Sequence, residues 1–159
     1  MAKVLEQKAR KEYICSKCKR TIHIGEKYKK IVAMYRKPTI VCCDCKIARS
    51  ELTNSEYYSW LYDFQDNISI ESVEDAQQAL EEIETQQEEL QEKFDNIPEQ
   101  LQDADAGCIL QERIEGLEEA CSELETLISE IEELEDEDIE DDDVMEKYNE
   151  IVEVINSIC

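Results

Sequence analysis

The chain has 159 residues, of which 36% are charged and 6% are aromatic, so it can form one or two small domains but not one large core. Residues 1–49 carry 14 Lys and Arg against 4 Asp and Glu, a net charge of +10, whereas the other 110 residues carry 3 against 37, a net charge of −34. We find no signal peptide and no apolar run of membrane-spanning length, which argues against a membrane protein, and we expect a soluble protein in a reducing cytoplasm.

Residues 1–12 are a lysine-rich lead-in. After the first two positions, only Val4, Leu5 and Ala9 are apolar. We therefore expect an arm or a short frayed helix before the first ordered element.

Two C-x-x-C pairs follow, Cys15 with Cys18 and Cys42 with Cys45, and 23 residues separate them. Zinc prefers four tetrahedral nitrogen or sulfur ligands, and a tight C-x-x-C turn presents two thiolates to one ion. Four thiolates leave no open position for water or substrate. The pattern therefore predicts one structural Zn²⁺ site that folds the chain and performs no chemistry.

Three other uses of these cysteines fit the sequence less well. Disulfides need an oxidising compartment, and a thioredoxin-like redox pair needs a βαβ unit, which is not visible around Cys15. An iron–sulfur cluster can use four thiolates, but the spacing matches neither common ferredoxin pattern.

Two neighbouring residues need a separate assignment. Cys43 is left out of the ligand set because Cys42 repeats the spacing of the first pair, and we expect it to be a small buried side chain. In Thr21–Ile24, alternation predicts that Ile22 and Ile24 share one face and that His23 lies on the other, at the surface.

The residues between the two pairs predict a β-hairpin. Gly25 ends a first short run, residues 28–35 favour a strand, Lys37-Pro38 favours a turn and residues 39–41 favour a second strand. Together with the cysteine turns this predicts a zinc ribbon or a treble clef, too small to be stable without its metal.

An aromatic helix is expected at 51–67, capped by Thr53, Asn54 or Ser55. Its rings could stack nucleobases, but their spacing of three and four residues also predicts ordinary packing faces. The large apolar residues are Tyr57, Tyr58, Trp60, Leu61, Tyr62 and Phe64.

Residues 68–135 predict an acidic helical hairpin of two coiled-coil-like helices, 72–97 and 107–135. Ser72 and Asp75 resemble a capping box, and Pro98 and Gly107 bracket the connection. The seams could pair antiparallel within one chain or between the chains of a homodimer. The first seam contains Val73, Ala76, Leu80, Ile83, Gln87, Leu90, Phe94 and Ile97, and the second contains Leu110, Ile114, Leu117, Cys121, Leu124, Ile128 and Ile131.

Residues 136–159 predict an acidic break followed by a last amphipathic helix. The acidic run fails as a calcium-binding EF-hand loop, because the required Gly and Glu are missing. The helix repeats the seam spacing at Val144, Tyr148, Ile151, Ile155 and Ile158. The predicted fold class is thus α+β, with a basic arm and metal head at 1–50, a connecting helix at 51–67, the hairpin at 68–135 and this segment last.

Several segments also resemble a known group of proteins. They are Tyr13–Cys18, Ile22, Gly25-Glu26 with Tyr28, Cys42–Cys45, Ser50–Thr53, Asn96–Gln102 and Leu110–Ile114. Together they resemble a family of small bacteriophage-encoded proteins with a zinc-ribbon-like head and an acidic coiled-coil tail, over most of the chain up to about Leu134. The resemblance implies a phage protein in the bacterial host cytoplasm and carries no established activity.

No catalytic motif is visible, since the chain has one His, three Gly and no nucleophile elbow or phosphate loop. We expect a binding protein, whose basic head contacts nucleic acid or nucleoprotein while the acidic helices bind a host or phage protein of nucleic-acid processing. The residues expected to meet phosphates are Lys17, Lys19, Arg20, Lys27, Lys29, Lys30, Arg36 and Lys37. The head charges could also simply balance the acidic body and the four thiolates.

The alternative function is a DNA mimic that inhibits a host nucleic-acid enzyme. The two seam helices hold 9 and 10 acidic residues. Over about 40 Å, at about 1.5 Å per residue, this gives roughly one charge per 2 Å, near the value of about 1.7 Å for duplex DNA. Solvated charged faces are, however, ordinary in coiled coils.

Overall fold

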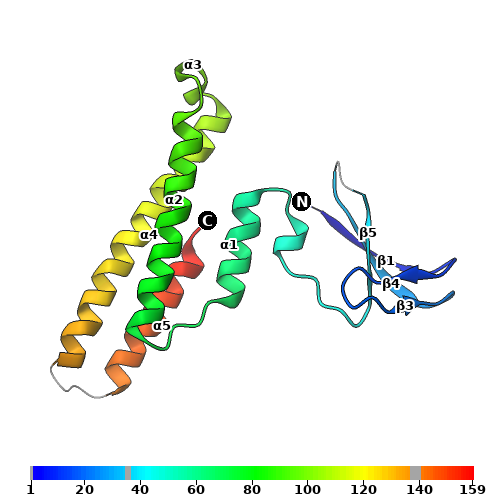
Figure 1. The fold of residues 1–159 in the computed structure, drawn as a ribbon, viewed down its shortest axis with the longest axis horizontal. Coiled ribbons are helices and arrows are strands. Elements are labelled where there is room, and N and C mark those ends of the chain that lie inside the picture. Colours follow the sequence, from blue (N-terminus) through cyan, green and yellow to red (C-terminus); the bar gives the residue numbers. More distant parts are fainter. Residues whose placement is uncertain (1, 35–36, 137–140) are drawn as a thin grey trace. The chain divides into compact units, whose positions relative to one another are not determined.

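The structure is a computed structural model that describes residues 2–34, 37–136 and 141–159. The chain is α+β, as predicted, and divides into two compact units, Met1–Asp66 and Asn67–Cys159. The first unit holds the strands and a short helix, and the second consists of helices (Figure 1).

The first unit is built on a three-stranded antiparallel sheet in the order β1-β4-β5. Strand β4 (Lys27–Val32) lies in the centre, between β1 (Lys3–Lys8) and β5 (Thr39–Cys42). A smaller antiparallel pair joins β2 (Tyr13–Ile14) to β3 (Thr21–Ile22). The predicted strand-turn-strand between the cysteine pairs is therefore confirmed as β4 and β5.

The N-terminal segment is strand β1, so the prediction of an arm or a frayed helix is wrong. Its register runs from Lys3 opposite Val32 to Lys8 opposite Lys27. All six side chains of β1 are exposed, so the strand gives no alternating apolar pattern that could reveal it. It forms because the central strand would otherwise leave a row of unpaired backbone groups at its edge.

The core of the first unit is small and includes two cysteines. Its buried residues are Ala9, Cys15, Ile22, Tyr28, Ile31, Val41 and Cys42. So few buried side chains supply little hydrophobic stabilisation, and a further source of folding energy is needed.

Beyond β3, the predicted alternation is half right. Ile22 is fully buried, but Ile24 is 69% exposed, because the strand ends at Ile22 and the chain turns through Gly25 at a φ of 90°. Only glycine adopts this φ without strain. His23 lies at the surface as predicted, with its Nδ1 3.1 Å from a carboxylate oxygen of Glu12.

A 3-10 turn, η1 (Ser50–Leu52), leads to helix α1 (Glu56–Asn67). The Ser55 hydroxyl accepts a hydrogen bond from the amide of Tyr58, which is the predicted capping arrangement. Two ring pairs stack along the helix, Tyr58 with Tyr62 and Trp60 with Phe64. The ring centres of the second pair lie 5.4 Å apart and the ring planes are nearly parallel, at 11°. This favours ordinary packing over a platform for nucleobases.

The second unit contains helix α2 (Val73–Asp95), the short α3 (Glu99–Gln102), α4 (Asp105–Asp136) and α5 (Asp141–Ser157). Helices α2 and α4 lie side by side and antiparallel (Figure 1), so Gln77 early in α2 donates a hydrogen bond to Glu132 late in α4. The predicted hairpin thus forms within one chain. Its capping residue Ser72 accepts a hydrogen bond from the amide of Asp75, as predicted.

The second and third predicted seams supply most of the core of this unit, and the first does so only in part. Of the first seam Ala76, Ile83 and Leu90 are buried, and Ala79, which was not predicted, is buried beside them. The half-buried members of that seam are Val73, Leu80, Gln87, Phe94 and Ile97. Helix α4 contacts both α2 and α5. The fully or almost fully buried residues are Ala76, Ala79, Ile83, Leu90, Leu117, Leu124, Ile131, Ile151 and Ile155. Among the described helices, none has the length and apolarity needed to cross a membrane.

The connection between the helices is more ordered than predicted. It contains α3, and α4 begins at Asp105 rather than at residue 107. A Cβ on Gly107 would lie 2.0 Å from the carbonyl oxygen of Gln102, so glycine permits this close approach of two backbone segments. The predicted acidic break includes residues 137–140, which lie outside the described residues, and on either side of them α4 ends at Asp136 and α5 begins at Asp141.

Candidate metal centre

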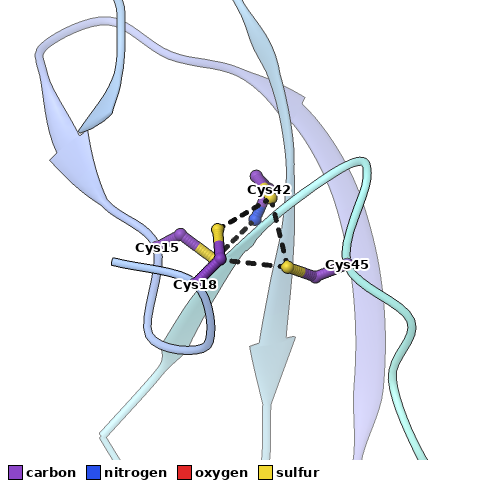
Figure 2. Close-up of side chains that lie close together, drawn as sticks. All are labelled: Cys15, Cys18, Cys42 and Cys45. Carbon is purple, nitrogen blue, oxygen red and sulfur yellow. Dashed lines mark hydrogen bonds between the residues drawn. The ribbon is translucent and has the colours of Figure 1, made fainter. Parts of the chain in front are cut away.

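The structure brings together the four cysteines of the predicted ligand set. Their sulfur atoms all lie within 4.8 Å of one another and converge on one point (Figure 2). Cys42 Sγ lies 3.4 Å from Cys45 Sγ and 3.6 Å from Cys18 Sγ, and Cys15 Sγ lies 3.9 Å from Cys45 Sγ. A tetrahedral ion with metal–sulfur bonds of about 2.3 Å separates its sulfur ligands by about 3.8 Å. The cluster therefore fits one tetrahedral metal ion.

The first cysteine turn lies between β2 and β3. The amide of Cys15 donates a hydrogen bond to the carbonyl oxygen of Arg20 (2.9 Å), and the amide of Lys19 donates one back to Cys15 (3.1 Å). Closing this turn places Lys19 at a φ of 62°, in the left-handed region. The side chain of Lys19 donates a hydrogen bond from Nζ to the carbonyl of Ser16, so it lies against its own turn.

The second turn begins where β5 ends, and Cys45 donates its amide to the carbonyl of Cys42 (3.3 Å). Lys29 of β4 donates hydrogen bonds from Nζ to the carbonyl oxygens of Cys43 (2.9 Å) and Cys45 (3.0 Å). Its ammonium therefore holds the backbone of this turn against β4. No α-helix begins at Cys45, so the ribbon, and not the treble clef, describes this arrangement.

Backbone groups also contact the sulfur atoms. The amide of Cys42 donates to Sγ of Cys15 at 3.3 Å, and both residues are almost completely buried. Amide–sulfur hydrogen bonds stabilise thiolates and orient metal ligands. Cys43 lies outside the cluster, in keeping with its omission from the predicted ligands, but it is partly exposed and not buried as predicted.

The thiols of the cluster differ in acidity. Burial opposes ionisation of Cys15, but hydrogen bonds from the amides of Cys42, Cys18 and Lys17 outweigh it and lower the pKa of Cys15 to about 6. Hydrogen bonds with the thiols of Cys42 and Cys18 raise the pKa of Cys45 to about 12. The thiols therefore share protons among themselves, and a metal that binds all four must displace those protons.

Part of the predicted phosphate-binding set is used inside the head. Lys17 pairs with Glu51 at 2.6 Å and Arg20 pairs with Asp44 at 3.1 Å. Lys29 holds the second cysteine turn. The charges of these three residues are thus largely compensated by groups of the head itself. These contacts depend on strand register, so they could not be inferred from the spacing of residues in the sequence.

The other members of the predicted set are more accessible to a ligand. Within the described residues, Lys19, Lys27, Lys30 and Lys37 have no ion-pair partner, but Lys19 donates its ammonium to the carbonyl of Ser16. Lys27, Lys30 and Lys37 are the ones without such a bond to their own turn. Arg36 lies outside the described residues. The three lysines therefore remain the members of this set best able to contact an external anion.

Comparison of the chain with protein-family models, with curated proteins and with solved structures gives no match.

Proposed function

We propose that this chain is a non-catalytic zinc-binding protein whose basic head contacts nucleic acid and whose acidic helices contact a protein partner. The observation that carries the proposal is the closed cluster of four cysteine sulfurs within a positively charged unit. Residues 1–66 carry 14 basic and 8 acidic side chains, a net charge of +6, and residues 67–159 carry 3 and 33, a net charge of −30.

Zinc is the metal that best suits the cluster. Four thiolates in a tetrahedral arrangement are typical of structural zinc sites, and they leave no position for a reacting water. Sulfur atoms within 4.8 Å of one another surround a single ion closely. A multi-iron cluster needs inorganic sulfide between the thiolates and hence a wider cage.

The helical unit offers a surface for a basic protein segment. A groove of about 670 Å³ is lined by residues of α4 and α5, both apolar and acidic. The lining consists of Leu127 and Val154, the hydroxyl residues Ser122 and Thr126, and the acidic residues Glu119, Glu123, Glu150 and Glu153. Opposite charge would steer a basic partner to this groove. The resemblance to phage proteins suggests that the partner belongs to the nucleic-acid machinery of a bacterial host or its phage.

The nucleic-acid contact is tested with the full-length, zinc-loaded protein and fluorescently labelled oligonucleotides over a range of salt concentrations. We expect weak binding that decreases with salt, because counterions are released from the phosphates. The variant Lys27→Gln with Lys37→Gln should bind more weakly. The matched variant Lys46→Gln with Lys93→Gln removes two charges outside the predicted set and should bind nearly as well as the wild type. No binding even at low salt would refute the nucleic-acid part of the proposal.

A DNA mimic remains the second candidate, favoured by the exposed carboxylates of the helical unit. The exposed glutamates of α2 and α4 include Glu81, Glu82, Glu84, Glu88, Glu92, Glu112, Glu115, Glu118, Glu123, Glu132 and Glu133. This candidate predicts that the full chain inhibits a DNA-binding enzyme. That inhibition would survive the lysine substitutions and fall when several of these glutamates become glutamine.

A further inference from the structure

The first unit contains a hollow of about 620 Å³ that none of the predicted site residues except Lys30 borders. It lies where the end of β1, the start of β2 and strand β4 meet. Its polar and aromatic lining consists of Gln7, Lys8, Arg10, Tyr13, Tyr28 and Lys30. The volume lies in the range of small-ligand pockets, about 300–1,000 Å³.

We propose that this hollow binds one nucleotide unit of a single-stranded nucleic acid, with its base against Tyr13 and its phosphates at Lys8, Arg10 and Lys30. The proposal rests on the nucleic-acid binding proposed above and names the site for it.

Backbone hydrogen bonds fix the walls of the hollow. Gln7 and Tyr28 are directly paired across β1 and β4. Just beyond β1, Ala9 donates its amide to the carbonyl of Glu26 and accepts from the amide of Gly25, both at 2.8 Å. The backbone that carries Lys8 and Arg10 is therefore held beside the sheet, so the positions from which these side chains extend are set before a ligand arrives.

The charge of the hollow selects an anion. Lys8, Arg10 and Lys30 line it, and no carboxylate does. None of the three has an ion-pair partner among the residues that the structure describes. Three cations without a carboxylate among them therefore line one hollow, which makes the field inside it positive.

The aromatic part of the hollow selects a planar ring. Tyr28 is buried, and its hydroxyl donates to Oε1 of Gln7 at 3.0 Å, so this ring forms a fixed wall. Tyr13 is only partly buried, and its ring centre lies 5.2 Å from that of Tyr28. Lys11 places its ammonium 5.6 Å from the Tyr13 ring centre. A half-exposed ring with cations around it is the arrangement that stacks bases while holding the backbone of a single strand.

Double-stranded nucleic acid does not fit this site, because its bases are not free to enter the hollow. Its bases are paired and stacked on each other, and a base enters a protein pocket only after unpairing. Single strands present each base face at no such cost, so we expect them to be preferred.

The test uses the full-length, zinc-loaded protein and three labelled ligands of equal length: oligo(dT), an abasic strand and a duplex. Tyr13→Leu should weaken oligo(dT) binding about tenfold, as is usual for loss of one stacking ring, and leave abasic-strand binding unchanged. Tyr13→Phe should retain wild-type affinity. Arg10→Gln should weaken binding of both single strands, whereas Lys46→Gln, outside the hollow, should weaken neither by as much.

The outcomes separate this site from the broader proposal. If the wild type binds oligo(dT) while Tyr13→Leu and Arg10→Gln both behave like Lys46→Gln, nucleic-acid binding stands and the hollow is refuted. If the wild type binds none of the strands at low salt, the proposed function itself fails. If an acidic phosphopeptide binds in a Tyr13-dependent manner and oligo(dT) does not, the nucleotide assignment is overturned.

Discussion

The amide of Cys42 donates a hydrogen bond to Sγ of Cys15 at 3.3 Å, although the two residues are 27 positions apart in the chain. This contact joins the two cysteine turns directly, so the second turn orients a ligand of the first. The geometry of the cluster therefore depends on both turns at once. Loss of either turn should disorder the whole head.

The first prediction follows from this coupling. Chelation of the metal in reducing buffer should unfold strands β1 to β5 while leaving α2, α4 and α5 helical, because the helices bury their own apolar seams. Structural zinc in small sites contributes on the order of 10 kcal/mol, more than so small a core supplies. Hydrogen exchange should show lost protection in residues 2–34 and retained protection in residues 73–95. Protection unchanged in both units after chelation would contradict it.

A second prediction concerns Lys29, which bonds two carbonyl oxygens of the second cysteine turn. Lys29→Met should destabilise the head by about 1–3 kcal/mol and speed metal release, since it removes hydrogen bonds from a charged donor. Lys27→Met is the matched control, because it lies two positions away on the same strand without an ion-pair partner. Release of the metal to a chromogenic chelator measures both. Equal rates for the two variants would show that Lys29 is not needed to hold the turn.

A third prediction contrasts two glycines of α4. Gly107→Ala places a Cβ against the Gln102 carbonyl, which belongs to backbone, so the turn must shift at a cost of about 1–3 kcal/mol. Gly116→Ala meets nothing within 4 Å and should stabilise the helix by about 0.5–1 kcal/mol. Urea unfolding followed by circular dichroism compares them. Stabilisation by both substitutions would mean that the α3–α4 turn is looser than described.

A fourth prediction uses the buried thiol of Cys121. Burial, with further contributions from Glu84 and Glu125, raises its pKa from 9.0 to about 11. Because the folded state holds this proton more tightly than the unfolded state, the stability from this group is full below about pH 9 and is lost as pH rises toward about 11. Cys121→Ala should flatten the decline over that window. A decline of the same size in both proteins would assign it to other groups.

The sequence allowed the helices to be predicted well and the sheet only in part. Ser72 and the apolar repeat around Ile83 and Leu124 are local signals, so α2 and α4 could be read from them. Strand β1 has six exposed side chains and is held by its backbone, so no side-chain pattern marks it. The structural role of Gly107 was also hidden, because it depends on a contact with Gln102 across a turn.

In the candidate site, too, local features were predictable from the sequence and contacts between distant residues were not. The spacing of Cys15, Cys18, Cys42 and Cys45 predicted which sulfurs meet, because C-x-x-C turns are local. Lys29 was expected to meet phosphates, yet the register of β4 against β5 directs its ammonium to the cysteine turn. Charge counting cannot distinguish a cation used by the fold from one available to a ligand.

The most direct test of the structural zinc site is the metal content of the full-length protein purified in reducing buffer, measured by elemental mass spectrometry. We predict one zinc ion per chain, lost in the variant Cys18→Ser, with Cys15, Cys18, Cys42 and Cys45 protected from alkylation in the wild type until a chelator is added. A chain that folds its sheet without zinc, or that carries iron in its place, would contradict the account.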